Sequence, residues 1–270
     1  MRGRAASTVA IAAILLTGCA GTGERAADDR IYAIPAVVDV TRLLSPPPEE
    51  VAQSRDLAEV RAAQQSRTAE QAAAAEAGAR VDVFLFASVL GPAFTADKVP
   101  LTARFFSRVY RSAIPSLQLT KDCWSRPRPF VVDPTLAPLE KVLSGTRSPA
   151  AAEERRTLPR PVQLPAGSPC AVPSPAAAYS PSYPSGHATI GAMMSILLAE
   201  MVPERREALF TRGWEYGDAR VLSGVHFPSD VEAGRILGTV LVGLLQQDAR
   251  FRADLRAARE ELRAALDYPR

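Results

Sequence analysis

Long apolar runs without alternation constrain the fold of this 270-residue chain more than any other feature. Residues 185–201 and 230–245 are predominantly apolar, and neither shows the every-second-residue pattern of a half-buried strand. Both runs are also longer than a typical strand, so each predicts a largely buried helix. Residues 97–113 carry apolar side chains at helical spacing, and residues 248–266 combine such spacing with many charges, which is typical of an amphipathic helix.

Two N-terminal segments extend this helical pattern. Residues 49–77 are rich in Ala, Glu, Gln and Arg and contain neither Gly nor Pro, a composition that predicts one continuous helix. Its apolar face is thin, so we expect this helix to cover the surface. Residues 80–91 are apolar and end at Gly91-Pro92, a dipeptide that stops a helix.

The exception is the segment 130–183, in which prolines recur every few residues. A long stretch without regular structure inside a domain is usually a functional loop or is disordered. Because this one joins a cationic segment to a helix that begins with a histidine, we expect it to form part of the wall of a site. The whole pattern predicts an all-α fold, a single helical-bundle domain with one long Pro-rich loop and no internal repeat.

The first residues are typical of an export signal. Arg2 and Arg4 precede an apolar run that is too short to span a bilayer. The end of this run, Leu16-Thr-Gly-Cys19, resembles the lipobox of bacterial lipoproteins, which implies cleavage before Cys19 and a lipid on its sulfur. The alternative is an ordinary cleaved signal followed by an incidental cysteine. The expected division of the chain is a signal peptide at 1–18, the lipidated cysteine and a tether at 19–44, and the folded domain at 45–270.

The net charge and the cysteine content limit which binding partners and which cell compartment are expected. The formal charge of +3 falls to +1 when Arg2 and Arg4 leave with the signal, which gives no indication of a nucleic-acid partner. Export to an oxidising compartment predicts a disulfide between Cys123 and Cys170, and two separate buried thiols are the alternative. We expect a periplasmic protein that its lipid holds at a bacterial membrane. The sequence leaves a homo-oligomer open.

The chain has two histidines, and the first lies where a helix should begin. His187 follows Ser185, which is a good helix N-cap, and Gly186, which allows a close backbone approach. The N–H groups at the start of a helix are free to bind an anion. This segment therefore predicts an anion site with an imidazole beside it, although a plainly capped helix is the simpler interpretation of the three residues alone.

Cations that could hold a phosphoryl group lie in two other segments. Lys121 and Arg128 belong to one, and Arg220 belongs to the other. Arginine suits oxyanions because its planar fork binds two oxygens at once, and lysine adds a point charge. Arg126 is also nearby, but Pro127 separates it from Arg128, and its direction stays open. Each cation taken alone is more simply a solvated surface charge.

The second histidine, His226, lies four residues before Asp230. Pro228 stands between them, so we expect His226 in a turn and a helix that starts near residues 229–230. Asp230 can then accept a hydrogen bond from Nδ1 of His226, which leaves Nε2 to act as a nucleophile. The alternative for an isolated His-Asp pair is a structural histidine.

Together these motifs resemble the signature of the type 2 phosphatidic acid phosphatase (PAP2) superfamily, which includes the vanadium haloperoxidases. The three parts of the signature lie at residues 121–129, 184–187 and 220–230, in that order. The sequence around them, at residues 182–187 and 224–235, is most similar to the class A bacterial nonspecific acid phosphatases. Residues 43–48 are similar to the same class.

The resemblance implies an all-helical fold and the hydrolysis of soluble phosphomonoesters through a phosphohistidine, with no metal ion and no cofactor. It implies that His226 is the nucleophile, that Asp230 orients it and that His187 protonates the leaving group. The residues implied to hold the phosphoryl oxygens are Lys121, Arg128, Ser185, Gly186 and Arg220. One position departs from the family: Ala219 stands where a serine is usual, so one hydroxyl is lost.

Three other functions are weighed against this one. A vanadium-dependent haloperoxidase would bind vanadate with the same residues, but the chain is short and has no third histidine. A membrane lipid phosphatase needs several spanning helices, and no run after residue 19 approaches the required length. A non-catalytic phosphate-binding envelope lipoprotein would not need both an acid and a nucleophile.

Overall fold

The computed structural model describes residues 31–35, 38–147 and 180–269, and within these ranges all regular structure is helical. The predicted all-α fold is confirmed. The α-helices are α1 (Glu50–Ser66), α2 (Ala69–Ala77), α3 (Ala87–Leu90), α4 (Pro100–Trp124), α5 (Pro129–Val132), α6 (Glu140–Arg147), α8 (Gly186–Met201), α9 (Arg206–Leu222), α10 (Pro228–Leu245) and α11 (Ala249–Ala265). Short 3₁₀ helices are η1 (Val40–Leu43), η2 (Val83–Phe86) and η3 (Pro203–Arg205).

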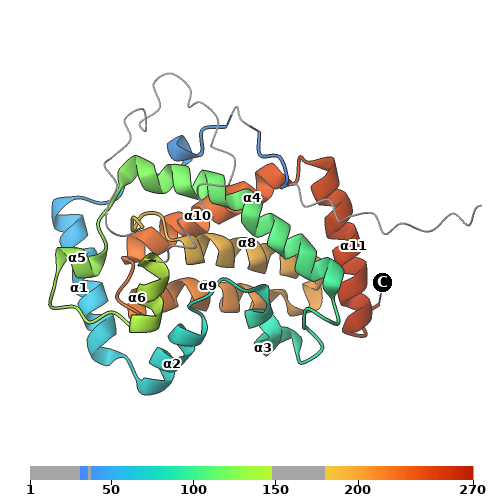
Figure 1. Cartoon of the computed structure of the whole chain (residues 1–270), viewed down its shortest axis with the longest axis horizontal. Helices are drawn as coiled ribbons and strands as arrows, with labels where there is room; N and C mark the ends of the chain where they lie inside the picture. Colours follow the sequence, from blue (N-terminus) through green and yellow to red (C-terminus); the bar gives the residue numbers. More distant parts are fainter. Residues whose placement is uncertain (1–30, 36–37, 148–179, 270) are drawn as a thin grey trace, which may run out of the picture.

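Helix α8 lies at the centre of the bundle (Figure 1). Helices α9 and α10 pack along it, and α4 and α11 contact it as well. Most of its residues are buried, as the apolar run predicted. Two glycines allow the close approach of its neighbours: a Cβ on Gly238 of α10 would lie 2.3 Å from Thr189 O, and a Cβ on Gly213 of α9 would lie 2.6 Å from the Ser195 side chain.

Helix α4 is longer than the helix predicted over residues 97–113. It continues to residue 124 with Pro115 inside it. Beyond the proline, Leu117 and then Lys121 continue the buried face of the helix. Packing of this face offsets the hydrogen bond that Pro115 cannot donate, and the extension carries Lys121 into the bundle.

The single helix predicted over residues 49–77 is wrong in one respect, because the chain forms two helices there. Thr68 caps the second one: its Oγ accepts from the N–H of Gln71, and the Gln71 side chain accepts from the N–H of Thr68. Such a capping box favours a new helix start. Most residues of α1 and α2 are exposed, as expected, but the break brings α2 against α9.

Helix α9 was missed by the sequence analysis. Charged residues interrupt its apolar residues, and Gly213 and Gly217 lower its helix propensity. Both glycines lie against α8, where close packing offsets that cost. The helix matters for function because its last turns carry Arg220.

Several sequence predictions lie outside the described residues. These are the signal peptide, Cys19, and most of the Pro-rich loop with Cys170. Cys123 lies in the last turn of α4, close to Lys121, but its predicted pairing with Cys170 stays a prediction. The described parts of the predicted loop are residues 130–147 and 180–183. The expectation of no regular structure is wrong for the first part, because α5 and α6 form there.

The N-terminal segment that is described packs on the helices. Tyr32 and Val40, which fall within the stretch assigned to the tether, are buried in the main core. Tyr32 stacks edge-on against Phe251 of α11, with ring centroids 5.2 Å apart. Among the described helices, none has both the length and the apolar character that crossing a membrane requires.

Candidate active site

His226 lies in the turn between α9 and α10, as the sequence predicted. Pro228 is the first residue of α10, and the fixed φ of proline starts the helix there. Asp230 follows in the first turn, and its Oδ2 lies 3.3 Å from Nδ1 of His226. Both side chains are buried. An ionised carboxylate can only accept a hydrogen bond, so Nδ1 carries the hydrogen and Nε2 carries the lone pair.

Asp230 is held by four donors from three parts of the chain. Oδ2 accepts from His226, from the Ser182 hydroxyl and from the N–H of Phe227 at 2.9 Å. Oδ1 accepts from Nη1 of Arg126 at 2.6 Å. Burial raises the pKa of Asp230, but these hydrogen bonds and the nearby charge outweigh burial and lower the pKa to about 2. Asp230 is therefore a fixed anion behind His226.

Arg128 lies on the other side of the imidazole. Its Nη1 is 3.0 Å from Nε2 of His226 and donates to Val225 O at 2.8 Å, while its Nε donates to Ser180 O at 2.8 Å. Burial lowers the pKa of Arg128 to about 10, so the side chain stays charged at neutral pH. Burial and the charge of Arg128 together lower the pKa of His226 well below its ordinary value. His226 is thus a neutral base that faces a cation.

Lys121 reaches the same region from the end of α4. Its Nζ donates to Pro181 O at 2.6 Å, and the side chain is buried. Together with the bond from Arg128 to Ser180 O, this contact shows that the described end of the Pro-rich loop does line the site. The backbone of that end holds both cations in place.

Arg220 is the largest fully buried side chain of the described residues. Its Nη2 donates to Ala75 O, at the end of α2, at 2.7 Å. Its Nε and Nη1 are buried and have no hydrogen-bond partner within the described part of the chain. Burial lowers the pKa of Arg220 to about 10. A charged guanidinium with two open donors is well suited to receive the oxygens of an anion.

The start of α8 brings in the remaining predicted residues. Ser185 is the N-cap of α8, with its Oγ 3.4 Å from the N–H of Ala188, and its own N–H donates to the backbone O of Asp230 at 2.9 Å. Gly186 begins the helix, and His187 follows in the first turn. The predicted helix start is confirmed, and the backbone bond joins it directly to the start of α10.

His187 lies between α8 and the segment that follows α2. Its Nε2 is 3.0 Å from Ala79 O, and its ring centroid is 5.3 Å from that of Tyr216. Burial is the largest cause that lowers the pKa of His187, to about 3, and the charges of Arg220, Arg128 and Lys121 act in the same direction. The charges of Arg128 and Lys121 therefore act on both histidines, and the charge of Arg220 acts on His187.

The structure thus brings the predicted site residues together from three segments. It also adds groups that the sequence analysis did not assign to the site: the Arg126 side chain, the Ser182 hydroxyl and the carbonyl groups of Ala75 and Ala79. Carbonyl groups carry no sequence signal, because every residue has one. Arg126 could have been recognised from its position two residues before Arg128, whose buried side chain it accompanies.

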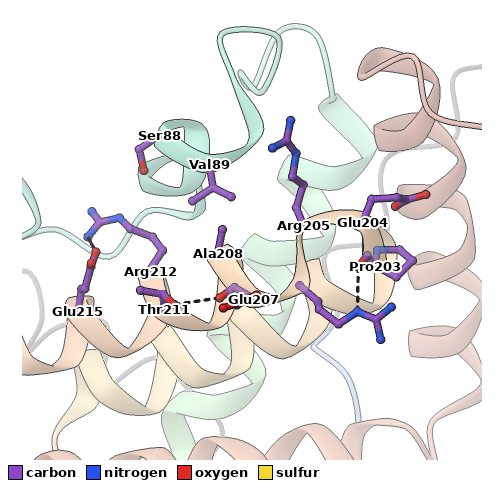
Figure 2. Close-up of a pocket in the computed structure, with 11 residues that line it drawn as sticks. Ser88, Val89, Pro203, Glu204, Arg205, Glu207, Ala208, Thr211, Arg212 and Glu215 are labelled. Carbon is purple, nitrogen blue, oxygen red and sulfur yellow. Dashed lines mark hydrogen bonds and ion pairs between the residues drawn. The ribbon is translucent and has the colours of Figure 1, made fainter.

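The pocket in Figure 2 is a different place. It is lined by residues of α3, η3 and the beginning of α9, and none of the predicted site residues lines it. Several of its charged side chains have partners within the protein: Arg212 lies 3.7 Å from Glu215, and Nε of Arg206 donates to Pro203 O at 3.0 Å. Among the described residues, no group of three or more His, Cys, Asp or Glu side chains is placed to hold a metal ion.

The sequence profile of the PAP2 superfamily matches residues 106–253, which is more than half of the chain. The chain belongs to the PAP2 superfamily. The matched region includes α8, α9 and α10 and every residue that the sequence predicted for the phosphoryl site, whereas α1, α2 and the carbonyl groups of Ala75 and Ala79 lie outside it.

Relatives within the superfamily carry phosphatase names. A non-specific acid phosphatase from Salmonella typhimurium is 47% identical over 81 residues, which are 30% of this chain and 32% of the relative. An acid phosphatase from Zymomonas mobilis is 29% identical over 180 residues, 67% of this chain and 56% of the relative. The matches therefore span less than two thirds of either relative. A transmembrane PAP2-type phosphatidylglycerolphosphate phosphatase from Bacillus subtilis aligns with 20% identity and a TM-score of 0.44, covering 74% of this chain and 86% of its own.

Proposed function

We propose that this PAP2-superfamily protein is an acid phosphatase that hydrolyses phosphomonoesters through a phosphohistidine on His226, without a metal ion. The observation that carries the proposal is the setting of His226, with an anion at Nδ1 and a buried cation 3.0 Å from Nε2. A phosphoryl group drawn in by its charged oxygens meets a lone pair there. The acid phosphatase names of the relatives support the same activity.

In the first half of the reaction, the Nε2 lone pair of His226 attacks phosphorus, and the bond from phosphorus to the ester oxygen breaks in line. The phosphorylated imidazole is cationic, and Asp230 stabilises it. Lys121, Arg128 and Arg220 neutralise the charge on the other oxygens. The free N–H groups at the start of α8 and the Ser185 hydroxyl are placed to contribute as well.

The leaving oxygen takes its proton from His187. Because Ala79 O can only accept, Nε2 of His187 carries a hydrogen, and Nδ1 is the atom that gains and loses the catalytic proton. In the second half, water gives a proton to His187 and attacks phosphorus, the bond to Nε2 of His226 breaks, and inorganic phosphate leaves. The lowered pKa of His187 means that acid conditions favour its protonated form, which accords with an acidic optimum.

A substrate panel tests this function. Nucleotides, sugar phosphates, phytate and aryl phosphates are assayed from acidic to neutral pH, with and without a chelator and with and without vanadate. We expect hydrolysis that the chelator does not affect, inhibition by vanadate, and an acid-labile phosphoryl group on His226 after a rapid quench. Halide oxidation by vanadate-loaded protein without phosphatase activity would instead favour the haloperoxidase alternative.

We also propose that the protein is exported and held at a membrane through a lipid on Cys19. Residues 45–270 are the proposed catalytic domain, and Tyr32 and Val40 of the preceding segment pack into its core. The basis for the anchor is the N-terminal sequence alone. Metabolic labelling with a radioactive fatty acid tests the anchor: the full chain should incorporate label and remain with membranes, and a Cys19→Ser variant should do neither. An unlabelled full chain would indicate an ordinary cleaved signal.

A further inference from the structure

Asp56 is a carboxylate on α1 that the reaction above does not use. Its residue is buried, its Oδ2 accepts from Nη2 of Arg126 at 2.9 Å, and the same oxygen accepts from the Ser229 hydroxyl. A buried carboxylate is costly in free energy unless it is paired, so this contact is a built feature of the fold. Helix α1 lies outside the region that matches the PAP2 profile, and the family comparison gives Asp56 no role.

The partners of Asp56 lead directly to His226. Nη1 of Arg126 donates to Oδ1 of Asp230 at 2.6 Å and to the Ser229 hydroxyl at 2.8 Å. The other oxygen of Asp230 lies 3.3 Å from Nδ1 of His226. The guanidinium also stacks over the ring of Phe227, 4.0 Å from its centroid, which fixes its plane. A continuous line of charge-assisted hydrogen bonds therefore runs from α1 to the imidazole.

The charges alternate along this line. Without Asp56, Arg126 would be an unbalanced buried cation, and it would compete with His226 for the negative charge of Asp230. With Asp56 in place, Arg126 is neutralised on one side, and the charge of Asp230 acts on the imidazole. This matters most when His226 is phosphorylated and becomes cationic, because an anion nearby then stabilises the intermediate.

We propose that Asp56 is a positioning residue for phosphoryl transfer: it holds Arg126, and through Arg126 it keeps Asp230 oriented and negatively charged toward His226. This inference rests on the phosphohistidine reaction proposed above. It concerns turnover rather than substrate binding, because the hydrogen bonds of Asp56 go to Arg126 and Ser229, and neither of these is a phosphate-binding residue.

The test is an Asp56→Asn variant, which keeps the size of the side chain and removes its charge. We expect kcat for p-nitrophenyl phosphate to fall about 10- to 100-fold, the range for a hydrogen bond to a charged group. The inhibition constant of inorganic phosphate should stay at the wild-type value, because Lys121, Arg128 and Arg220 are untouched. Asp56→Glu restores the charge and should recover part of kcat.

Asp133→Asn is the matched control. Asp133 is also buried and also pairs with α1, through Nε of Arg61 at 2.7 Å. It lies at the end of α5, and its side chain bonds to Arg61 and Thr135 rather than to the residues that link Asp56 to His226. This variant should keep kcat. The inference is overturned if Asp56→Asn keeps wild-type kcat, or if both variants lose kcat and phosphate binding together, as loosening of α1 would cause.

Two further measurements keep the test decisive. If Asp56→Asn does not fold, Ser229→Ala removes one partner of the carboxylate without exposing a buried charge, and it should lower kcat with the phosphate inhibition constant unchanged. An unaltered kcat in Ser229→Ala contradicts the role of Asp56. An inactive wild-type protein, or an active His226→Ala variant, would instead reject the phosphohistidine reaction itself.

Discussion

The two buried arginines on opposite sides of the candidate site, Arg126 and Arg220, have different partners. On the nucleophile side, Arg126 faces two carboxylates, Asp56 and Asp230. We call the region of the cations proposed to hold phosphate the clamp side. There, Arg220 is 0% exposed, donates to one carbonyl oxygen and has two donors without a partner among the described residues. Arg126 is thus neutralised by two carboxylates, although its Nε also lacks a partner among the described residues, whereas the described residues give Arg220 no carboxylate.

This contrast indicates where an anionic ligand would bind. A buried cation without a counterion costs free energy, and a chain selected only for stability would remove it or pair it. Arg220 retains this unfavourable desolvation free energy. A bound oxyanion would offset it by accepting hydrogen bonds from the two open donors. Fixed donors that await charge are a main source of rate enhancement in enzymes. Arg126, by contrast, supports a group that belongs to the protein.

The largest effect should come from removing the nucleophile. His226→Ala is expected to lower kcat by about 10⁴- to 10⁶-fold, as for loss of a covalent nucleophile, and to abolish the trapped phosphohistidine. Binding of inorganic phosphate should persist, because the clamp side is intact. Steady-state assays and rapid-quench labelling check both points, and near-normal turnover would reject the assignment.

Removing the proposed acid should separate substrates by their leaving groups. His187→Asn is expected to lower kcat for alkyl phosphates by about 10²- to 10⁴-fold, the range for general acid catalysis. The loss for p-nitrophenyl phosphate should be much smaller, because that leaving group needs no proton. The comparison is made with both substrates at the same pH. An equal loss for both would assign His187 to binding instead.

The two arginines give the most direct test of the contrast. Arg220→Met should lower kcat/KM by about 10²- to 10³-fold and leave the free energy of unfolding unchanged or higher. Arg126→Met leaves two buried carboxylates unpaired and should cost about 3–5 kcal/mol of stability. Urea unfolding of both variants measures this, and equal destabilisation would mean that Arg220 is structural.

The smallest effect is a dependence of stability on pH. The pKa of His187 falls from 6.5 to about 3 on folding, so the unfolded chain binds the proton more readily. The contribution of neutral His187 to the free energy of unfolding is fully present above pH 6.5, and it decreases as the pH falls from 6.5 toward 3. His187→Asn should reduce this slope without removing it, because the pKa of His226 is lowered as well. Thermal unfolding at several pH values checks the prediction, and an unchanged slope in the variant contradicts it.

The residues of the candidate site could be predicted from the sequence more completely than the helices that carry them. The motif residues carry side chains whose chemistry is visible at once, and their spacing marks the family. The helices were harder to predict from the sequence. Gly213 and Gly217 disfavour a helix where α9 forms, Pro115 disfavours one in the second half of α4, and Thr68 starts a new helix within a segment of uniform composition. In each case packing or a local cap outweighed helix propensity.

The all-α class, the superfamily and the motif residues proposed to carry the chemistry could all be read from the sequence. These follow from apolar periodicity and from side-chain types, which are local properties. Tertiary packing was needed to place two carboxylates against Arg126 and none of the described ones against Arg220. It also brings Asp56 of α1, the carbonyl of Ala75 in α2 and the carbonyl of Ala79 just after α2 to the site. Partners brought together from segments more than 50 residues apart depend on how helices pack, and no local pattern records that.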